Sequence, residues 1–269
     1  MPPSPSFDLA SRVNACGDGL YETEVPDGWQ QGRGAFGGLT IAYAVRAMEE
    51  RESERPLRAL TAELPGPLGL GRAEIRVSTL RRGRGVTTLE AHITQPDENG
   101  ELSVRGRVSG VFGGERPDDR TFAGPPPKMG SWQDAPPIPD GALPPRFARH
   151  FEYRVTGPFP FSGGDAPVAE GWIRPREPLN SWGAAEVVAM ADAYWPAIFA
   201  TQTAPRPMAT IAFTLHLQPI ATSLPTNAPL YYRARASSAG GGYVSEAREL
   251  WTQEGALVAL NPQTFVVIK

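Results

Sequence analysis

Residues 36–50 read FGGLTIAYAVRAMEE, a stretch that predicts a helix with apolar side chains on most of its surface. Its polar side chains gather only toward the end, at Arg46, Glu49 and Glu50. A helix that is apolar nearly all round must be enclosed by other elements of the fold. A curved antiparallel sheet that wraps around the helix would provide that enclosure.

Three segments with alternating apolar and polar side chains follow, at residues 73–81, 86–94 and 102–112. The third has a period of two, which is typical of a strand with one buried face. Its apolar face carries Leu102, Val104, Val108 and Phe112, and its other face carries Arg105 and Arg107. Residues 96–100, PDENG, are a turn signal and predict a hairpin between the second and third segments.

The second half of the chain repeats this order of elements. Residues 184–200 again predict a mostly apolar helix. Four strand-like segments follow it, at residues 210–218, 230–237, 243–251 and 257–268. Two predicted turns also correspond: residues 254–258, EGALV, resemble residues 99–103, NGELS, and residues 239–243 resemble residues 81–86. Both halves are therefore predicted to be one helix followed by an antiparallel meander.

A proline-rich stretch, residues 115–146, separates the two halves. It has almost no aliphatic periodicity, which is typical of a linker or of a connection that lies on the surface. We therefore expect an N-terminal unit over residues 1–114, a linker over 115–146 and a C-terminal unit over 147–269. The predicted fold class is α+β, and two such units side by side can join their edge strands into one continuous curved sheet.

The composition excludes several classes of protein. The 269 residues include 26 Lys and Arg against 29 Asp and Glu, a net charge of −3 that provides no basic surface for nucleic acid. The longest apolar stretch, residues 187–200, contains Asp192 and Pro196 and is too short for a membrane helix. The N-terminus lacks a basic start followed by an apolar run, so we expect no signal peptide and a cytoplasmic location. The single cysteine, Cys16, cannot form an internal disulfide.

The sequence lacks the usual signatures of several enzyme chemistries. It has no Gly-x-Ser-x-Gly nucleophile elbow and no P-loop, and its histidines, His92, His150 and His216, lack the spacing of a zinc-binding helix. Residues 32–37 do match the dinucleotide fingerprint Gly-x-Gly-x-x-Gly. They follow PDGWQQ, which is typical of a turn and not of the buried strand that such a site needs. We therefore expect neither a metal nor a redox cofactor.

Two alternatives are open for Gly37 and Gly38, at the start of the first helix. Their free N–H groups and the positive end of the helix dipole can face an oxyanion. Equally, two glycines allow the helix to pack close to a strand. The sequence does not decide between these two roles.

Three polar side chains interrupt apolar segments of the second half. Asp192 lies in VVAMADAYWPAIF, where a carboxylate without partners is unfavourable by several kcal/mol. The alternative for Asp192 is an N-cap, because it lies four residues before Pro196. Thr210 opens TIAFTLHL and Gln263 lies in LVALNPQTFVVI. Ordinarily such a threonine is a strand former and such a glutamine is a solvated or edge residue.

The order of several short motifs resembles the bacterial acyl-CoA thioesterase II family. The motifs are AFGGL…AYA at residues 35–44, LRALTA at 57–62, RRGRG at 81–85, GWIR at 171–174, MAD at 190–192, ATI at 209–211 and LVA…Q at 257–263. The resemblance covers both halves, roughly residues 15–112 and 147–269, and implies a double hotdog fold with two tandem helix-in-sheet units. It also implies an enzyme of lipid metabolism that hydrolyses an acyl-CoA to free acid and CoA without a cofactor.

The resemblance assigns roles to the three polar residues. In the family, an Asp–Thr–Gln constellation holds and activates a water molecule that attacks the thioester carbonyl. These residue types fall on Asp192, Thr210 and Gln263. The N–H of Gly38, or of its neighbour Gly37, would then stabilise the oxyanion.

The chain departs from the family pattern at two places. Family members often carry Asp-His-Ser after the Thr-Ile pair and Gln-Glu-Gly near the end. This chain has AFT at residues 212–214 and QTF at residues 263–265. The lining of the pocket, and hence the acyl group that it accepts, is therefore open.

Further expectations concern partners and alternatives. Coenzyme A carries several phosphates, and Arg81, Arg82 and Arg84 are candidates to bind them; the alternative is that they form a solvated hairpin tip. An acyl-CoA-binding or scaffold protein without turnover is the alternative function. A hotdog hydratase would need an Asp/His pair, and no histidine lies within a few residues of Asp192. Association into a homo-oligomer is common in the family and is a further expectation.

Overall fold

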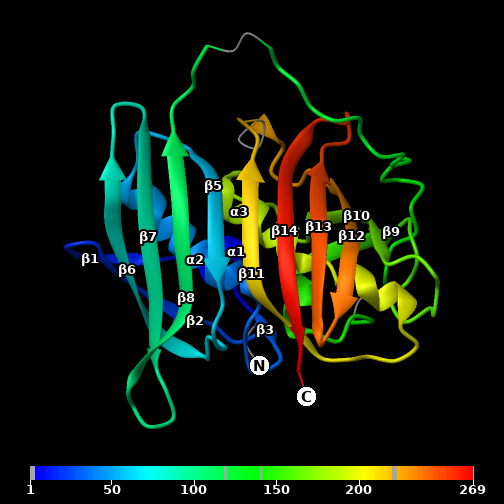
Figure 1. The fold of residues 1–269 in the computed structure, drawn as a ribbon, viewed down its shortest axis with the longest axis horizontal. Helices are drawn as coiled ribbons and strands as arrows, with labels where there is room; N and C mark the ends of the chain where they lie inside the picture. The colour runs from blue at the N-terminus through cyan, green and yellow to red at the C-terminus, as the bar shows by residue number, and fades with distance from the viewer. Residues whose placement is uncertain (1–3, 118–119, 140, 220–222, 269) are drawn as a thin grey trace.

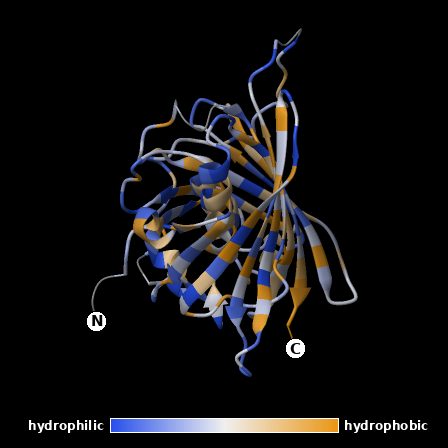
Figure 2. Ribbon diagram, turned by 90° about the vertical axis from the view of Figure 1, so that its left-hand side faces the viewer, coloured by the Kyte–Doolittle hydropathy of each residue, from blue (hydrophilic) through white to orange (hydrophobic). Residues whose placement is uncertain are grey.

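One antiparallel sheet of twelve strands runs through the whole structure, and two helices, α2 (Gly37–Arg51) and α3 (Ala184–Ala193), lie side by side against one of its faces (Figures 1 and 2). The structure is a computed structural model, and it describes residues 4–117, 120–139, 141–219 and 223–268.

The remaining elements follow one another in a similar order in the two halves. The N-terminal half contributes α1 (Phe7–Ala10), β1 (Asn14–Gly17), β2 (Leu20–Val25), β3 (Gln30–Gln31), β4 (Gly34–Ala35), β5 (Leu57–Glu63), β6 (Gly71–Arg82), β7 (Val86–Pro96) and β8 (Leu102–Gly113). The C-terminal half contributes the 3-10 helix η1 (Arg146–His150), β9 (Phe151–Val155), β10 (Val168–Pro175), the 3-10 helix η2 (Ala197–Thr201), β11 (Met208–Leu217), β12 (Leu230–Gly240), β13 (Tyr243–Trp251) and β14 (Leu257–Val267).

The order of the strands is symmetric about the central pair β5 and β11. On one side of this junction the order is β2-β6-β7-β8-β5, and on the other it is β11-β14-β13-β12-β10. The junction itself is an antiparallel ladder that pairs Thr61 with Thr214 and Leu60 with Leu215. The predicted double hotdog with one continuous sheet is therefore confirmed.

Two hairpin turns repeat the same backbone geometry in both halves. Gly100 and Gly255 both have a φ of 82°, a left-handed value that glycine adopts without steric cost. In each turn the glycine N–H donates to the carbonyl three residues earlier, to Asp97 O at 3.0 Å and to Thr252 O at 3.1 Å. The predicted correspondence of these two turns therefore extends to their hydrogen bonds.

The helix α2 is enclosed, as its apolar surface requires. Every residue from Gly38 to Val45 is buried. α3 packs antiparallel against α2, because Gly38 near the start of α2 lies beside Ala189 and Arg46 near its end pairs with Glu186. The start of α2 therefore meets the C-terminal end of α3.

The second predicted helix, residues 184–200, is shorter than expected. α3 ends at Ala193, and residues 194–196 lead into the separate turn η2. The physical reason is Pro196, which lacks a backbone N–H donor and disfavours helical conformation in the residue before it. Within the described ranges, no helix combines the length and the apolar composition needed to cross a membrane.

The predicted inward face of the third strand holds only for part of β8. Val108 and Phe112 are buried, whereas Leu102 and Val104 are 65% and 41% exposed. These two residues lie near the tip of the β7–β8 hairpin, which protrudes at the lower end of Figure 1. A shift in the pairing of β7 with β8 between Ile93 and Thr94 puts Leu102 and Val104 on the opposite face of the sheet from Val108 and Phe112, so the alternation does not continue one buried face to the tip.

Candidate active site

Asp192 lies in the last turn of α3, and its carboxylate is buried where α3 meets the start of α2. The side chain is 5% exposed. Its Oδ2 accepts a hydrogen bond from the Gly38 N–H at 2.7 Å, and its Oδ1 accepts one from Gln263 Nε2 at 3.2 Å. The N-cap alternative for Asp192 is wrong, because the residue lies inside α3 and Pro196 occupies the N-cap position of the next helical turn.

Gly37 and Gly38 allow the two helices to approach each other closely. A Cβ atom on Gly37 would lie 2.7 Å from Asp192 Oδ2, and one on Gly38 would lie 3.1 Å from the Ala189 Cα. Both distances are shorter than ordinary van der Waals contacts. The geometry therefore supports the close-packing role, although the partner is a helix and not a strand. The Asp192 carboxylate also lies at the positive end of the α2 dipole, which stabilises its negative charge.

Gln263 contacts the carboxylate from β14, and Thr210 contacts Gln263 from the neighbouring strand β11. Thr210 Oγ1 donates to Gln263 Oε1 at 3.2 Å, which links all three predicted side chains in one hydrogen-bonded row. This contact depends on a β-bulge between Thr210 and Ala212. The bulge pairs Thr210 with Phe265, and so it turns the threonine to the same face of the sheet as Gln263.

The hydrogen-bonded row is open to solvent at one end. Asp192 and Gln263 are buried, whereas Thr210 is half-buried. Leu64, also half-buried, lies beside Gly37 at the same place. The exposed end of the row is therefore the one at Thr210 and Leu64.

The predicted site residues do not include an ion pair that lies behind the carboxylate. Arg248 Nη1 donates to the Ala191 carbonyl at 2.8 Å and lies 3.7 Å from Asp192 Oδ1. Its Nε donates to Glu246 Oε1 at 2.7 Å. Both Arg248 and Glu246 are buried, at 2% and 3% exposure.

The alternation of inward and outward residues along β13 and β14 predicts the burial of these polar residues. On β13, Glu246 and Arg248 lie on the same face as the buried apolar residues that flank them two positions away. On β14, Asn261 lies on the same face as Gln263, and its Oδ1 accepts a hydrogen bond from Gln263 Nε2 at 2.7 Å. A polar residue at an inward position of a strand therefore marks this site.

Opposing effects act on the pKa of the Asp192 carboxyl. Burial disfavours the charged form and raises the pKa above its ordinary value. The positive charge of Arg248 lowers the pKa, as do the hydrogen bonds from Gln263 and the Gly38 N–H. Burial is the largest effect, so the pKa is raised on balance, as is common for groups that exchange protons in active sites.

The arginines Arg81, Arg82 and Arg84 lie at the opposite end of α2 from Asp192. Arg82 Nη2 pairs with Glu52 Oε2 at 3.0 Å, just beyond the C-terminal end of α2. A helix of 15 residues spans about 22 Å. The structure therefore does not bring these exposed arginines near the other predicted site residues, and it favours the alternative of a solvated hairpin tip.

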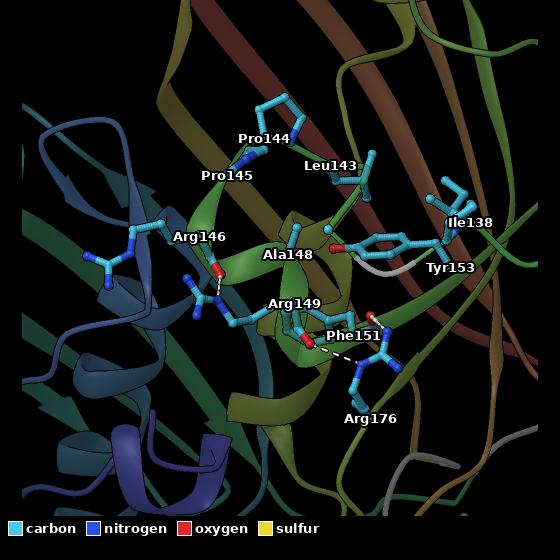
Figure 3. A pocket seen from close by; sticks show the side chains of 12 residues that line it. Ile138, Leu143, Pro144, Pro145, Arg146, Ala148, Arg149, Phe151, Tyr153 and Arg176 are labelled. Atoms are coloured by element: carbon cyan, nitrogen blue, oxygen red, sulfur yellow. Dashed lines mark hydrogen bonds between the residues drawn. The ribbon is translucent and has the colours of Figure 1, made fainter. Parts of the chain in front are cut away.

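A cavity of about 230 Å³ lies between the end of the proline-rich connection and β9 (Figure 3). Leu143, Tyr153 and Arg149 are among the residues that line it. The Tyr153 hydroxyl donates to the Ala193 carbonyl at 3.0 Å, so one wall of the cavity contacts the residue that follows Asp192. The three predicted catalytic side chains do not line this cavity.

An aromatic cluster fixes the segment that leads into α2. Trp29 stacks on His150 with ring centroids 3.9 Å apart and on Phe36 with centroids 5.9 Å apart. The Trp29 carbonyl also accepts a hydrogen bond from the Phe36 N–H at 3.0 Å. Because His150 belongs to η1, the cluster ties the start of α2 to the C-terminal half of the chain.

We expect acid to destabilise the fold through His150. Burial lowers the pKa of His150 to about 4, whereas the unfolded residue has a pKa of about 6.5. The unfolded chain therefore binds the proton first, so the stability that neutral His150 contributes above pH 6.5 is lost as the pH falls toward 4. After allowance for partial exposure, we expect a loss of about 1 kcal/mol between pH 7 and pH 5.

Urea unfolding at pH 7 and pH 5 measures this loss. His150→Phe keeps a ring on Trp29 and should show a smaller loss at pH 5, whereas a change at the exposed His216, His216→Gln, should leave the loss unchanged. An equal acid sensitivity of the parent and His150→Phe would contradict the prediction.

Two family profiles match the sequence. Residues 25–113 match the acyl-CoA thioesterase N-terminal domain, and residues 122–267 match the acyl-CoA thioesterase C-terminal domain. None of the curated proteins with which the sequence was compared matches it.

Several solved structures share the fold over almost the whole chain. A protein of unknown function with a hot dog fold from Alicyclobacillus acidocaldarius has a TM-score of 0.89 at 23% identity, with 98% of both chains covered. Acyl-CoA thioesterase II from Mycobacterium marinum has a TM-score of 0.72 at 17% identity, again with 98% of both chains covered. The dehydratase domain of RzxB from Pseudomonas fluorescens has a TM-score of 0.64 at 15% identity, with 97% of this chain and 99% of that chain covered. At these identities the likeness shows the fold alone, and a fold by itself does not fix the reaction.

Proposed function

Because the chain belongs to the acyl-CoA thioesterase family, we propose that it hydrolyses the thioester bond of an acyl-CoA and releases a free acid and CoA. The observation that supports this most directly is the hydrogen-bonded row of Asp192, Gln263 and Thr210. Thioester hydrolysis needs a positioned water, a proton acceptor and a donor for the developing oxyanion. The row contains groups suited to the first two tasks.

Asp192 is the proposed general base. It takes a proton from a water molecule while the water oxygen forms a bond to the thioester carbonyl carbon. The tetrahedral intermediate then collapses with cleavage of the carbon–sulfur bond, and the CoA thiolate takes the proton from Asp192. The raised pKa of this carboxyl supports the role, because a base that titrates nearer neutral pH both accepts and returns a proton readily.

Thr210 and Gln263 are proposed to orient the water. The Gln263 amide donates to Asp192 through Nε2 and accepts from Thr210 through Oε1, so these two contacts fix its orientation. The Thr210 hydroxyl donates its hydrogen bond to Gln263, so its oxygen is left to accept a hydrogen bond from the water. The water is thus held between Thr210 and Asp192.

The oxyanion is assigned to a backbone donor at the start of α2. The N–H groups in the first turn of a helix have no partner within the helix. That of Gly38 already donates to Asp192, so of the two predicted donors we assign the Gly37 N–H to the oxyanion. The positive end of the helix dipole adds to this stabilisation.

We expect Gln263→Ala to lower kcat by about 30-fold and Thr210→Val by about tenfold, because each variant loses hydrogen bonds of about 1 kcal/mol or more that hold the water and its base. Release of free thiol at saturating substrate measures both values. Thr214→Val is the matched control, since Thr214 lies on the same strand and faces the other side of the sheet. Equal losses in Thr210→Val and Thr214→Val would argue against a role for the Thr210 hydroxyl.

A panel of short, medium, long and aromatic acyl-CoAs tests the function itself. We expect the release of free thiol from at least one of these classes. Tight binding of an acyl-CoA without any release would instead favour an acyl-CoA-binding or scaffold protein. A protein that neither binds nor cleaves any of them would overturn the proposal.

A further inference from the structure

Arg248 lies behind the Asp192 carboxylate, inside the C-terminal half. Its side chain is 1% exposed, and its guanidinium lies 5.6 Å from the ring centroid of Tyr232 and 5.2 Å from that of Phe265. A buried guanidinium is unfavourable unless its charge and its N–H groups have partners. The partners of Arg248 therefore indicate what it does.

Two hydrogen bonds fix the guanidinium in place. Nη1 donates to the Ala191 carbonyl at 2.8 Å, and Nε donates to Glu246 Oε1 at 2.7 Å. Glu246 is itself held, because its Oε2 accepts a hydrogen bond from the Ala197 N–H at 2.6 Å. Arg248 and Glu246 together thus hold the chain on both sides of Asp192, at the end of α3 and at the start of η2.

The distance between Arg248 and Asp192 suits a charge interaction without a hydrogen bond. Nη1 lies 3.7 Å from Oδ1, which is within the range of an ion pair but beyond that of a good hydrogen bond. The guanidinium therefore stabilises the negative charge without occupying the lone pairs of the carboxylate. Those lone pairs remain for Gln263, the Gly38 N–H and the proposed water.

We propose that Arg248 is a positioning residue for hydrolysis, which keeps Asp192 in its ionised form and holds the last turn of α3 in place while Glu246 holds Arg248. This inference rests on the proposed function, because it takes Asp192 to be the base. Arg248 adds a positive charge, which none of the three predicted catalytic side chains supplies.

The other groups around Asp192 are neutral or negative. They are Gln263 on β14, the Gly38 N–H of α2, Tyr153 on β9 and Tyr232 on β12, and Glu246 on β13 lies beyond them as the partner of Arg248. Burial raises the pKa of both tyrosines, so their phenols stay neutral. In the described part of the chain, Arg248 is therefore the cation that acts on this carboxylate.

The pH dependence of kcat/KM tests the role of Arg248. In the parent, activity is present above the pKa of Asp192 and is lost as the pH falls through it. Arg248→Met removes the cation and raises that pKa, so we expect the acid limb to move up by about one pH unit, with about a tenfold loss at pH values on that limb and recovery at alkaline pH. Arg248→Lys keeps the charge and should keep the limb near that of the parent.

Glu246→Gln and Arg233→Met complete the comparison. Glu246→Gln removes the negative charge that pairs with Arg248, so the guanidinium acts more strongly on Asp192 and the acid limb should move to lower pH, opposite to Arg248→Met. Arg233 pairs with Glu249 at 2.6 Å on the other face of β12 and β13, so Arg233→Met should leave the profile unchanged. An Arg248→Met protein that loses the same fraction of activity at every pH would overturn the proposal and leave Arg248 a structural residue.

A direct titration of Asp192 separates a failure of this inference from a failure of the proposed function. The carbon-13 NMR signal of its carboxyl, identified by its loss in Asp192→Asn, reports the pKa without any substrate. A pKa that rises in Arg248→Met in a protein that cleaves no acyl-CoA would sustain the charge effect and remove the hydrolytic role. An unmoved pKa in folded Arg248→Met would overturn the inference even if hydrolysis is observed. If Arg248→Met does not fold, the opposite shift expected for Glu246→Gln carries the test.

Discussion

Asp192→Asn is expected to lower kcat by about 10³-fold on every acyl-CoA that the parent protein cleaves. The amide has nearly the shape and volume of the carboxyl, but it cannot take a proton from water. The contacts from the Gly38 N–H and Gln263 Nε2 both need an acceptor, and an amide has only one oxygen. One contact is therefore lost, and we expect a decrease of about 1–2 kcal/mol in stability that leaves the protein folded.

Free-thiol release at saturating substrate measures this loss of turnover, and urea unfolding followed by circular dichroism reports the fold. Glu186→Gln is the matched control, because Glu186 is the other buried carboxylate of α3 and pairs with Arg46 in the first turn of that helix, whereas Asp192 lies in the last. That variant should lose stability but keep its turnover. A folded Asp192→Asn protein with the turnover of the parent would falsify the role of Asp192 as base.

The sequence predicts the elements that have a regular pattern of burial. α2 buries nearly its whole surface, and the strands of the meanders β6–β8 and β12–β14 each bury one face. The spacing of the apolar residues in these elements predicts this burial. The junction strand β5 has no such signal. It is short, and a shift in its pairing with β8 between Leu57 and Ala59 interrupts the alternation. Its place at the centre of the sheet depends on contacts with distant segments, which no local pattern contains.

The candidate site could be predicted only in part, and chiefly from the resemblance of short motifs. Asp192 is conspicuous as a charge within an apolar helix, but its partners Gly38 and Gln263 lie 154 and 71 residues away in sequence. Thr210 faces Gln263 only because of a β-bulge, and neighbouring residues do not predict that bulge. Arg248, by contrast, occupies an inward position of a regular strand, so its burial follows from the period of β13.

Gly38→Ala is expected to lower the stability of the protein by about 1–2 kcal/mol and its kcat by about 100-fold. Two effects on stability oppose each other. Alanine is a better helix former than glycine by about 1 kcal/mol, which alone would stabilise α2. The new Cβ, however, would lie 2.5 Å from the Phe36 ring and 3.1 Å from the Ala189 Cα. Phe36 is fully buried and stacks on Phe147 at 4.4 Å, so the ring has no room to move, and such overpacking costs about 1–3 kcal/mol.

The overpacking is relieved by a shift of α3 away from α2, and Asp192 moves with α3. A displacement of about 1 Å at a reacting group can cost about 100-fold in rate, which sets the expected loss of kcat. Urea midpoints and thiol release measure the two effects separately. Gly240→Ala is the control, because a Cβ at Gly240 meets no atom within 4 Å. A Gly38→Ala protein with a raised urea midpoint and an unchanged kcat would mean that helix propensity outweighs the contact with Ala189, and that the site does not need the close approach of α2 and α3.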